Sequence, residues 1–171
     1  RSCLDGSERS APWLRELVKT YAASLSYPGL RLFCALCALQ GKIAVFGDTE
    51  NAFQQSPPPV KNCYIRIDDA YKSWYEKKHG HVLEWEQYVI PLQRALQGHP
   101  EAGVLWAQKI NDIIKEDLGL KATVHEPTIY SGTIDGESIL MARQVDDYAI
   151  GSSSIEIGER LIATLNSKVT T

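Results

Sequence analysis

The sequence has few cysteines, and their arrangement completes no zinc site. Among 171 residues there are four, Cys3, Cys34, Cys37 and Cys63. Cys34 and Cys37 form a C-x-x-C pair, but no second pair or paired histidine completes a tetrahedral zinc site. Both lie in an apolar stretch, so we expect them to be buried side chains of a helix.

Long hydrophobic runs are also lacking. No apolar stretch approaches the roughly 20 residues that a membrane-spanning helix needs. The longest, residues 30–39, is interrupted by Arg31 and predicts a buried helix. The sequence has no initiator methionine and no signal-peptide pattern, and it opens abruptly at Arg1. We therefore expect an excised fragment of a longer protein, with no membrane partner.

The chain has no excess of positive charge. Lysine and arginine number 18 against 21 acidic residues, which gives a formal net charge of −3. Affinity for nucleic acid rests largely on Lys and Arg side chains that neutralise phosphates. The balance therefore argues against a self-sufficient nucleic-acid binder. Either nucleic acid is not the partner, or the basic surfaces belong to segments outside this chain.

The hydrophobic pattern predicts alternating helices and strands. Helices are expected at 12–23, 28–40, 69–78, 100–118 and from 152–154 to about 166. Strands are expected at 42–46, 63–67, 88–92, 129–130, 138–143 and 148–150. Strands adjoin directly in the last third of the chain, which favours an α+β class with a mainly antiparallel sheet.

Three aspartates occupy ends of the expected strands. Asp48 follows an apolar strand, and Asp146 and Asp147 lie together at the tip of a hairpin far downstream. Adjacent carboxylates are costly unless a divalent cation neutralises them. Two such cations can hold the attacking and leaving oxygens of a phosphoryl transfer. The alternative is a solvent-exposed Asp-Asp turn.

Three segments resemble motifs of reverse transcriptases from copia-type LTR retrotransposons. Residues 46–53, Phe-Gly-Asp-Thr-Glu-Asn-Ala-Phe, resemble the first polymerase motif, in which Ala and an aromatic follow the Asp at four and five positions. Residues 144–147, Gln-Val-Asp-Asp, resemble the family's Tyr-Val-Asp-Asp hairpin. Residues 91–106 resemble a segment in which a Leu-x-Gly turn leads into a Pro-started helix that ends in Trp. With weaker matches at 27–41 and 1–6, the resemblance covers nearly the whole chain.

The resemblance implies a right-hand polymerase palm, built on a ferredoxin-like antiparallel sheet with packed helices, plus part of the fingers. Residues 1–45 would be partial fingers and lead-in helices, and residues 46–171 the palm. The implied activity is that of an RNA-directed DNA polymerase, which adds dNTPs to a primer on an RNA or DNA template. Thumb and RNase H segments of the pol polyprotein would be further partners. The implied location is intracellular, in cytoplasmic virus-like particles and the nucleus.

Carried over to this sequence, the resemblance assigns a metal site. Asp48, Asp146 and Asp147 would be the catalytic carboxylates and would bind two Mg²⁺ or Mn²⁺ ions. Thr49 would add its backbone carbonyl to the metal ligands.

The resemblance also assigns contacts to substrates. Phe53 would lie under the incoming sugar and reject a 2′-hydroxyl, although core packing is its alternative role. Gln97 and Gly98 would touch the nucleotide, with Gly98 allowing close approach of the backbone. Arg1 would contact the triphosphate. Gln144 stands where the family has an aromatic beside the primer end, so the primer contact is expected to differ.

Two other functions stay open at this point. The chain could be a catalytically inactive, retrotransposon-derived fold kept as an interaction module, which primer extension would reveal. It could also be another two-metal nucleotidyl-transfer enzyme on a palm fold, such as a nucleotidyl cyclase. Phe53 and residues 97–100 disfavour the cyclase, which would turn over nucleotide without a template.

Overall fold

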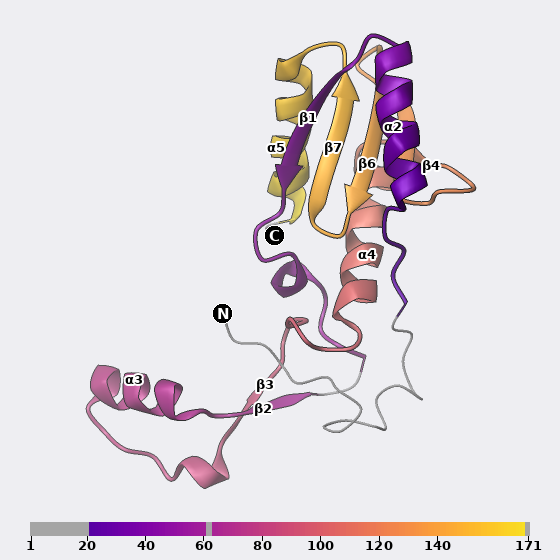
Figure 1. Ribbon diagram of the computed structural model, residues 1–171. Helices are drawn as coiled ribbons and strands as arrows, with labels where there is room; N and C mark the ends of the chain where they lie inside the picture. Colours follow the sequence, from indigo (N-terminus) through magenta and orange to yellow (C-terminus); the bar gives the residue numbers. More distant parts are fainter. Residues whose placement is uncertain (1–20, 61–62, 170–171) are drawn as a thin grey trace.

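The computed structural model describes residues 21–60 and 63–169. Figure 1 shows a sheet with helices on both faces and a separate projection below it. All strand pairs are antiparallel, so the predicted α+β class with an antiparallel sheet is confirmed. Of the helix predicted at 12–23, residues 12–20 lie outside the described residues and residues 21–23 are not helical.

The main sheet has five strands, and its order differs from the order in the chain. From one edge to the other they are β1 (Ile43–Asp48), β7 (Asp147–Ser152), β6 (Glu137–Gln144), β5 (Ile129–Ile134) and β4 (Lys121–Ala122). Because β7 is antiparallel to both neighbours, β1 and β6 run parallel with β7 between them. The strands predicted in this region form, and β4 was missed because two residues show no alternation.

One face of the sheet is covered by helix α2 (Tyr27–Leu39). The Ser26 hydroxyl caps its first turn by accepting the Gly29 N–H at 3.0 Å. Phe33 and Cys37, one turn apart, pack on the sheet against Ile129, Leu140, Ala142 and Ala149. Cys34 was predicted to be buried and is exposed, because α2 turns only one side towards the sheet. Cys37 is buried as expected.

The opposite face is covered by α4 (Ala102–Asp112), the π-helical turn η3 (Ile113–Asp117) and α5 (Ile155–Val169). The helix predicted at 100–118 thus forms as two elements. Alternate residues of β6 and β7 point into this layer. Its largest side chains are Trp106, Ile110, Ile114, Tyr130, Met141, Tyr148, Ile150, Leu161 and Leu165. Each such apolar side chain contributes about 1.5–3 kcal/mol when it is removed from water.

Helix α5 lies very close to strand β1. A Cβ atom added at Gly158 would lie 2.6 Å from Val45 Cγ2, and one added at Gly47 would lie 2.7 Å from Ile162 Cγ2. Two glycines therefore allow the helix to approach the strand backbone. This packing places Asn166 of α5 beside the carboxyl end of β1, where it donates to the Asp48 carbonyl at 3.0 Å.

Residues 63–92 form the projection, which we call the arm. It contains β2 (Tyr64–Arg66), α3 (Asp69–His79), the 3₁₀ turn η2 (Trp85–Gln87) and β3 (Val89–Pro91), with β2 and β3 paired. The predicted helix is confirmed, with Asp68 capping its start by accepting the Tyr71 N–H. No residue of α3 is buried. The aromatic rings of the arm contact one another, with Tyr75 and Trp85 centroids 5.3 Å apart.

Within residues 21–60 and 63–169, no helix is long and apolar enough to cross a bilayer.

Candidate functional site

The ends of β1 and β7 bring two of the predicted catalytic residues together. In the register of this strand pair, Asp48 lies directly opposite Asp147. Directly opposed residues of antiparallel strands have Cβ atoms about 4.5–5.5 Å apart and project from the same face. Two acidic segments distant in sequence therefore meet at one sheet end, as the carboxylate pattern predicted.

Asp146 lies in the two-residue turn that joins β6 to β7, so the predicted hairpin tip is confirmed. The other turn residue, Val145, has a φ of +58°. A positive φ at the first turn position is typical of a type II′ hairpin, where glycine is favoured. For a β-branched residue it is strained by about 1–3 kcal/mol. The turn is tied to β1, because the Thr49 N–H donates to the Asp146 carbonyl at 3.0 Å.

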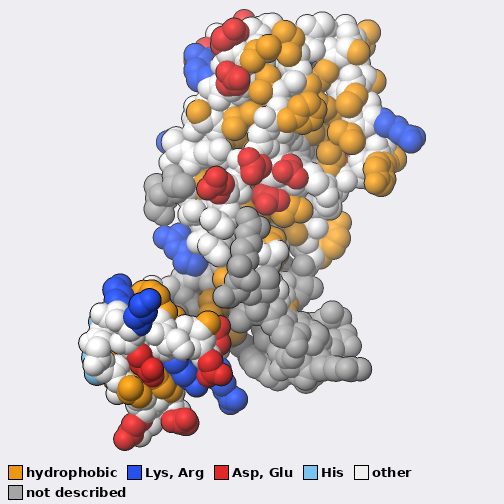
Figure 2. Space-filling model, turned by 60° about the vertical axis from the view of Figure 1, so that its left-hand side comes forward, with side chains coloured by type: hydrophobic (Ala, Val, Ile, Leu, Met, Phe, Trp, Pro, Cys, Tyr) orange, Lys and Arg blue, Asp and Glu red, His pale blue; other side chains and the backbone are white. Residues whose placement is uncertain are grey.

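A cavity of about 120 Å³ adjoins the carboxylates on one side. Asp48 and Asp146 line it together with Phe53 and Gln97. The remaining lining residues are Thr49, Glu50, Asn51, Ala52 and Gln54, from the end of β1 and the 3₁₀ turn η1 (Ala52–Gln55). Figure 2 shows Asp and Glu side chains gathered in the middle of one face of the molecule. Residues predicted to bind metal and nucleotide thus share this cavity.

The predicted nucleotide turn is formed around Gly98. This residue has a φ of +90°, which favours glycine, and the His99 N–H closes the turn on the Leu96 carbonyl at 3.0 Å. Gln97 reaches the cavity, whereas Gly98 is not among its lining residues. Arg1, the predicted triphosphate contact, lies outside the described residues.

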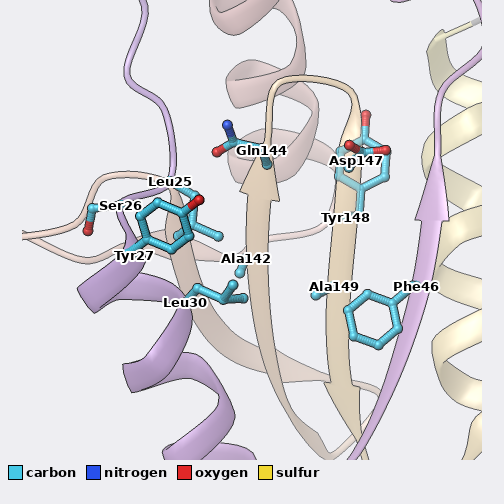
Figure 3. A pocket seen from close by; sticks show the side chains of 10 residues that line it. All are labelled: Leu25, Ser26, Tyr27, Leu30, Phe46, Ala142, Gln144, Asp147, Tyr148 and Ala149. Atoms are coloured by element: carbon cyan, nitrogen blue, oxygen red, sulfur yellow. The ribbon is translucent and has the colours of Figure 1, made fainter.

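A second, larger cavity of about 370 Å³ adjoins Asp147. Figure 3 shows Tyr27 and Leu30 of α2 on one side of it, Phe46 of β1 on the other, and Gln144 at the end of β6. Phe46 is 72% exposed although it is a large apolar residue. The Gln144 amide N–H donates to Ser24 Oγ at 2.8 Å. Most of this cavity is apolar, with polar groups near Asp147.

The three carboxylates do not enter a single cavity. Asp48 and Asp146 line the smaller one, and Asp147 lines the larger. Over the part of the chain that the structure describes, no three His, Cys, Asp or Glu side chains are grouped closely enough to hold a metal ion. The donor set itself suits a hard cation, because carboxylate and carbonyl oxygens are the ligands that Mg²⁺ prefers.

The backbone at Asp48 is held by buried hydrogen bonds. Thr49 is 3% exposed, and its hydroxyl donates to Asn166 Oδ1 at 2.8 Å. That hydroxyl has one proton, so the Tyr148 hydroxyl, also at 2.8 Å, donates to Thr49 Oγ1. The Thr49 side chain therefore fixes the end of β1. The roles of Tyr148 and Asn166 were not predicted, because only the packing of α5 on β1 reveals them.

Tyr148 gives a prediction for alkaline pH. Burial raises its pKa to about 12, against about 10 for an exposed tyrosine. Because the pKa of Tyr148 is higher in the folded state than in the unfolded state, its protonated hydroxyl contributes fully to the free energy of unfolding below pH 10. This contribution is lost as the pH rises from 10 to 12. We expect a loss of roughly 2–3 kcal/mol over this window, at 1.36 kcal/mol per unit of pKa. Denaturant unfolding at pH 9, 10, 11 and 12 measures it.

The matched control is Tyr148→Phe, which removes the titrating hydroxyl and keeps the ring. Its stability should fall much less between pH 10 and 12. A Tyr148→Phe variant that loses stability as steeply as the unmodified chain would assign the alkaline effect to other groups.

His99, which follows Gly98 in this turn, is buried and does not line either cavity. Burial lowers the pKa of its imidazole. Its Nδ1 accepts the Glu101 N–H at 3.2 Å, so the neutral ring carries its proton on Nε2, which faces Cys63 Sγ at 3.6 Å. His99 therefore joins the turn around Gly98 to the base of the arm.

No protein-family model, curated protein or solved structure matches the chain.

Proposed function

We propose that this chain is the palm core, with part of the fingers, of an RNA-directed DNA polymerase of the copia type. The observation that carries the proposal is the register of β1 and β7, which sets Asp48 opposite Asp147 beside the turn that holds Asp146. Residues 46–53 and 144–147 resemble two separate polymerase motifs, and this register joins them at one sheet end.

The topology supports a palm. Strands β1 and β6 run parallel with β7 between them, and α4 lies in the connection from β1 to β6. Helices α4 and α5 both pack on the same face. We interpret this order as the split β-α-β arrangement of ferredoxin-like folds, with β5 and β4 added at the β6 edge.

The donor chemistry of these residues, rather than a closed group of three carboxylates, supports a metal site of hard oxygen ligands. Asp48, Asp146, Asp147 and the Thr49 carbonyl would hold two Mg²⁺ or Mn²⁺ ions. Such ions neutralise developing charge on the attacking and leaving oxygens of a phosphoryl transfer. Among the described residues none of these carboxylates is in an ion pair, so their charge is available to a cation.

The two cavities suit the two substrates. On the smaller side, Phe53 and Gln97 would contact the sugar and phosphates of the incoming dNTP. On the larger side, the apolar walls from Phe46 and Leu30 would hold the end of the primer, and the Gln144 amide would replace the family's aromatic contact. The strand register sets Asp48, which lines the smaller cavity, opposite Asp147, which lines the larger one. Thumb and RNase H segments of the same polyprotein would complete the grip on the template.

Primer extension tests the proposal. The 171-residue chain is incubated with a primed RNA or DNA template, dNTPs and Mg²⁺ or Mn²⁺, and the product is sequenced. We expect additions that follow the template, at a low rate because the net charge of −3 weakens nucleic-acid binding. Nucleotide turnover without a template would instead indicate a cyclase-like enzyme. No turnover by a folded chain that binds no Mn²⁺ would indicate an inactive interaction module.

Sugar selection gives a second prediction. Phe53 lines the carboxylate cavity and also packs against the core, so its ring is held in place. Phe53→Val opens space below the sugar and should raise the rate of ribonucleotide addition relative to dNTP addition by about 10- to 200-fold, the usual range for such a change in pocket size. Single-nucleotide incorporation assays measure the ratio.

The matched control is Phe46→Val, the same change at an exposed phenylalanine of the other cavity. It should leave sugar selection unchanged. If Phe53→Val prefers dNTPs over ribonucleotides as strongly as the unmodified chain, Phe53 contributes only to core packing.

A further inference from the structure

The carbonyl oxygen of Val145 accepts two hydrogen bonds from the layer behind the sheet. The Trp106 indole N–H donates to it at 2.8 Å, and Arg143 Nη1 donates at 3.1 Å. Trp106 is fully buried and Arg143 is 2% exposed. The packing around both side chains therefore fixes the positions of the two donor groups.

The accepting peptide belongs to the strained residue of the hairpin turn. Val145 has a φ of +58°, which local sequence preference opposes. Such a conformation persists only where surrounding contacts over-determine it. Two buried donors on one carbonyl are contacts of this kind, because releasing the turn would leave both without an acceptor.

Arg143 is costly to bury, which argues that its position has a function. Its Nη2 donates to Asn111 Oδ1 at 3.4 Å, and its buried Nε has no hydrogen-bond partner. No described carboxylate forms an ion pair with it. A buried cation without an ion pair would be replaced cheaply by an apolar side chain if it only filled space. Here it lies in the strand that leads directly into the acidic turn.

We propose that Trp106 and Arg143 are positioning residues that hold Val145 in its positive-φ conformation. Their effect passes through the turn, because the next carbonyl, that of Asp146, accepts the N–H of Thr49 beside Asp48. Holding Val145 therefore fixes Asp146 and Asp147 relative to Asp48. The consequence for metal binding rests on the proposed function, whereas the geometry of the turn does not.

The first test measures the turn without any metal. Trp106→Phe keeps an aromatic ring and removes the donor. In this variant, amide hydrogen exchange at Thr49 should accelerate about five- to tenfold relative to the amides of central strand β7, because the bond to Asp146 loosens. The comparison with β7 removes any general loss of stability. Adding Val145→Gly, which relieves the positive φ, should restore protection at Thr49.

The second test measures Mn²⁺ affinity by electron paramagnetic resonance on the same chains. Residues that orient metal ligands typically change metal affinity by 10- to 100-fold. We expect about tenfold weaker binding in Trp106→Phe and recovery in Trp106→Phe with Val145→Gly. Arg143→Lys keeps a donor and a charge and should weaken binding less than Arg143→Met.

The outcomes separate this inference from the proposed function. An unmodified chain that binds no Mn²⁺ contradicts the polymerase site, while hydrogen exchange still decides whether the turn is held as inferred. If amide hydrogen exchange in Trp106→Phe accelerates equally at Thr49 and in β7, Trp106 contributes only to core packing. If Trp106→Phe does not fold, Arg143→Met gives the same comparison. Failure of Val145→Gly to restore Thr49 protection would overturn the role of strain.

Discussion

Asp147→Asn is expected to lower the rate of nucleotide addition by about a thousandfold or more, and Asp48→Asn should do the same. The two carboxylates lie opposite each other across β1 and β7, and an amide keeps the shape of the side chain without its charge. Metal ions contribute several kcal/mol of charge stabilisation to phosphoryl transfer, and each 1.36 kcal/mol changes a rate tenfold. Single-turnover incorporation and Mn²⁺ titration measure the loss.

Glu50→Gln is the matched control. Glu50 lines the same cavity as Asp48 but is not part of the opposed pair, so its neutralisation should change the rate little. Stability distinguishes lost chemistry from misfolding. Like charges directly opposite each other destabilise a strand pair, so without metal Asp147→Asn should unfold at an equal or higher denaturant concentration. Full activity in Asp48→Asn or Asp147→Asn would refute the polymerase site.

Ile110→Ala is expected to lower the free energy of unfolding by about 2–5 kcal/mol, the usual cost of truncating a buried isoleucine. Ile110 is fully buried in the layer of α4 and α5 behind the sheet. It lies one turn from Trp106 on the same helix, so the cavity left behind opens next to the indole that holds the hairpin turn. Urea unfolding followed by circular dichroism measures the change.

Ile155→Ala provides the comparison, since Ile155 is 50% exposed at the start of α5. The same chemical change there should cost well under 1 kcal/mol, because little apolar surface leaves contact with the core. Equal losses at Ile110 and Ile155 would contradict the position of the core between α4 and the sheet.

The sequence predicted the helices and strands well where the hydrophobic periodicity and the residues that favour turns or helix ends agree. The alternation around residues 138–150 predicted the β6–β7 hairpin, and the helix expected at 69–78 matches α3. Strand β4 was missed because a strand of two residues is too short to show the alternation of apolar and polar side chains. Cys34 was placed wrongly because an apolar run does not tell which side of a helix meets the sheet. Burial there is set by tertiary packing.

The candidate site was predictable as a set of residues but not as an arrangement. Motif resemblance named Asp48 and Asp147, and only the strand register sets them opposite each other. Val145 is a residue that turn preferences would reject at positive φ, so its conformation follows from the donors that surround it. Trp106, the residue at which the 91–106 motif ends, is fully buried. Its hydrogen bond to the turn depends on where α4 lies behind the sheet.

The arm divides the molecule into parts of unequal cooperativity. Helix α3 buries none of its residues, and the arm's aromatic rings contact one another instead of joining the core behind the sheet. Regions with few buried apolar contacts open at a lower free energy than the core. We therefore expect the arm to open at a lower free energy than the sheet end that carries the carboxylates. If a partner binds the arm, the free energy needed to order the arm lowers the affinity for that partner. The conformation of the β6–β7 hairpin turn is not changed by this binding.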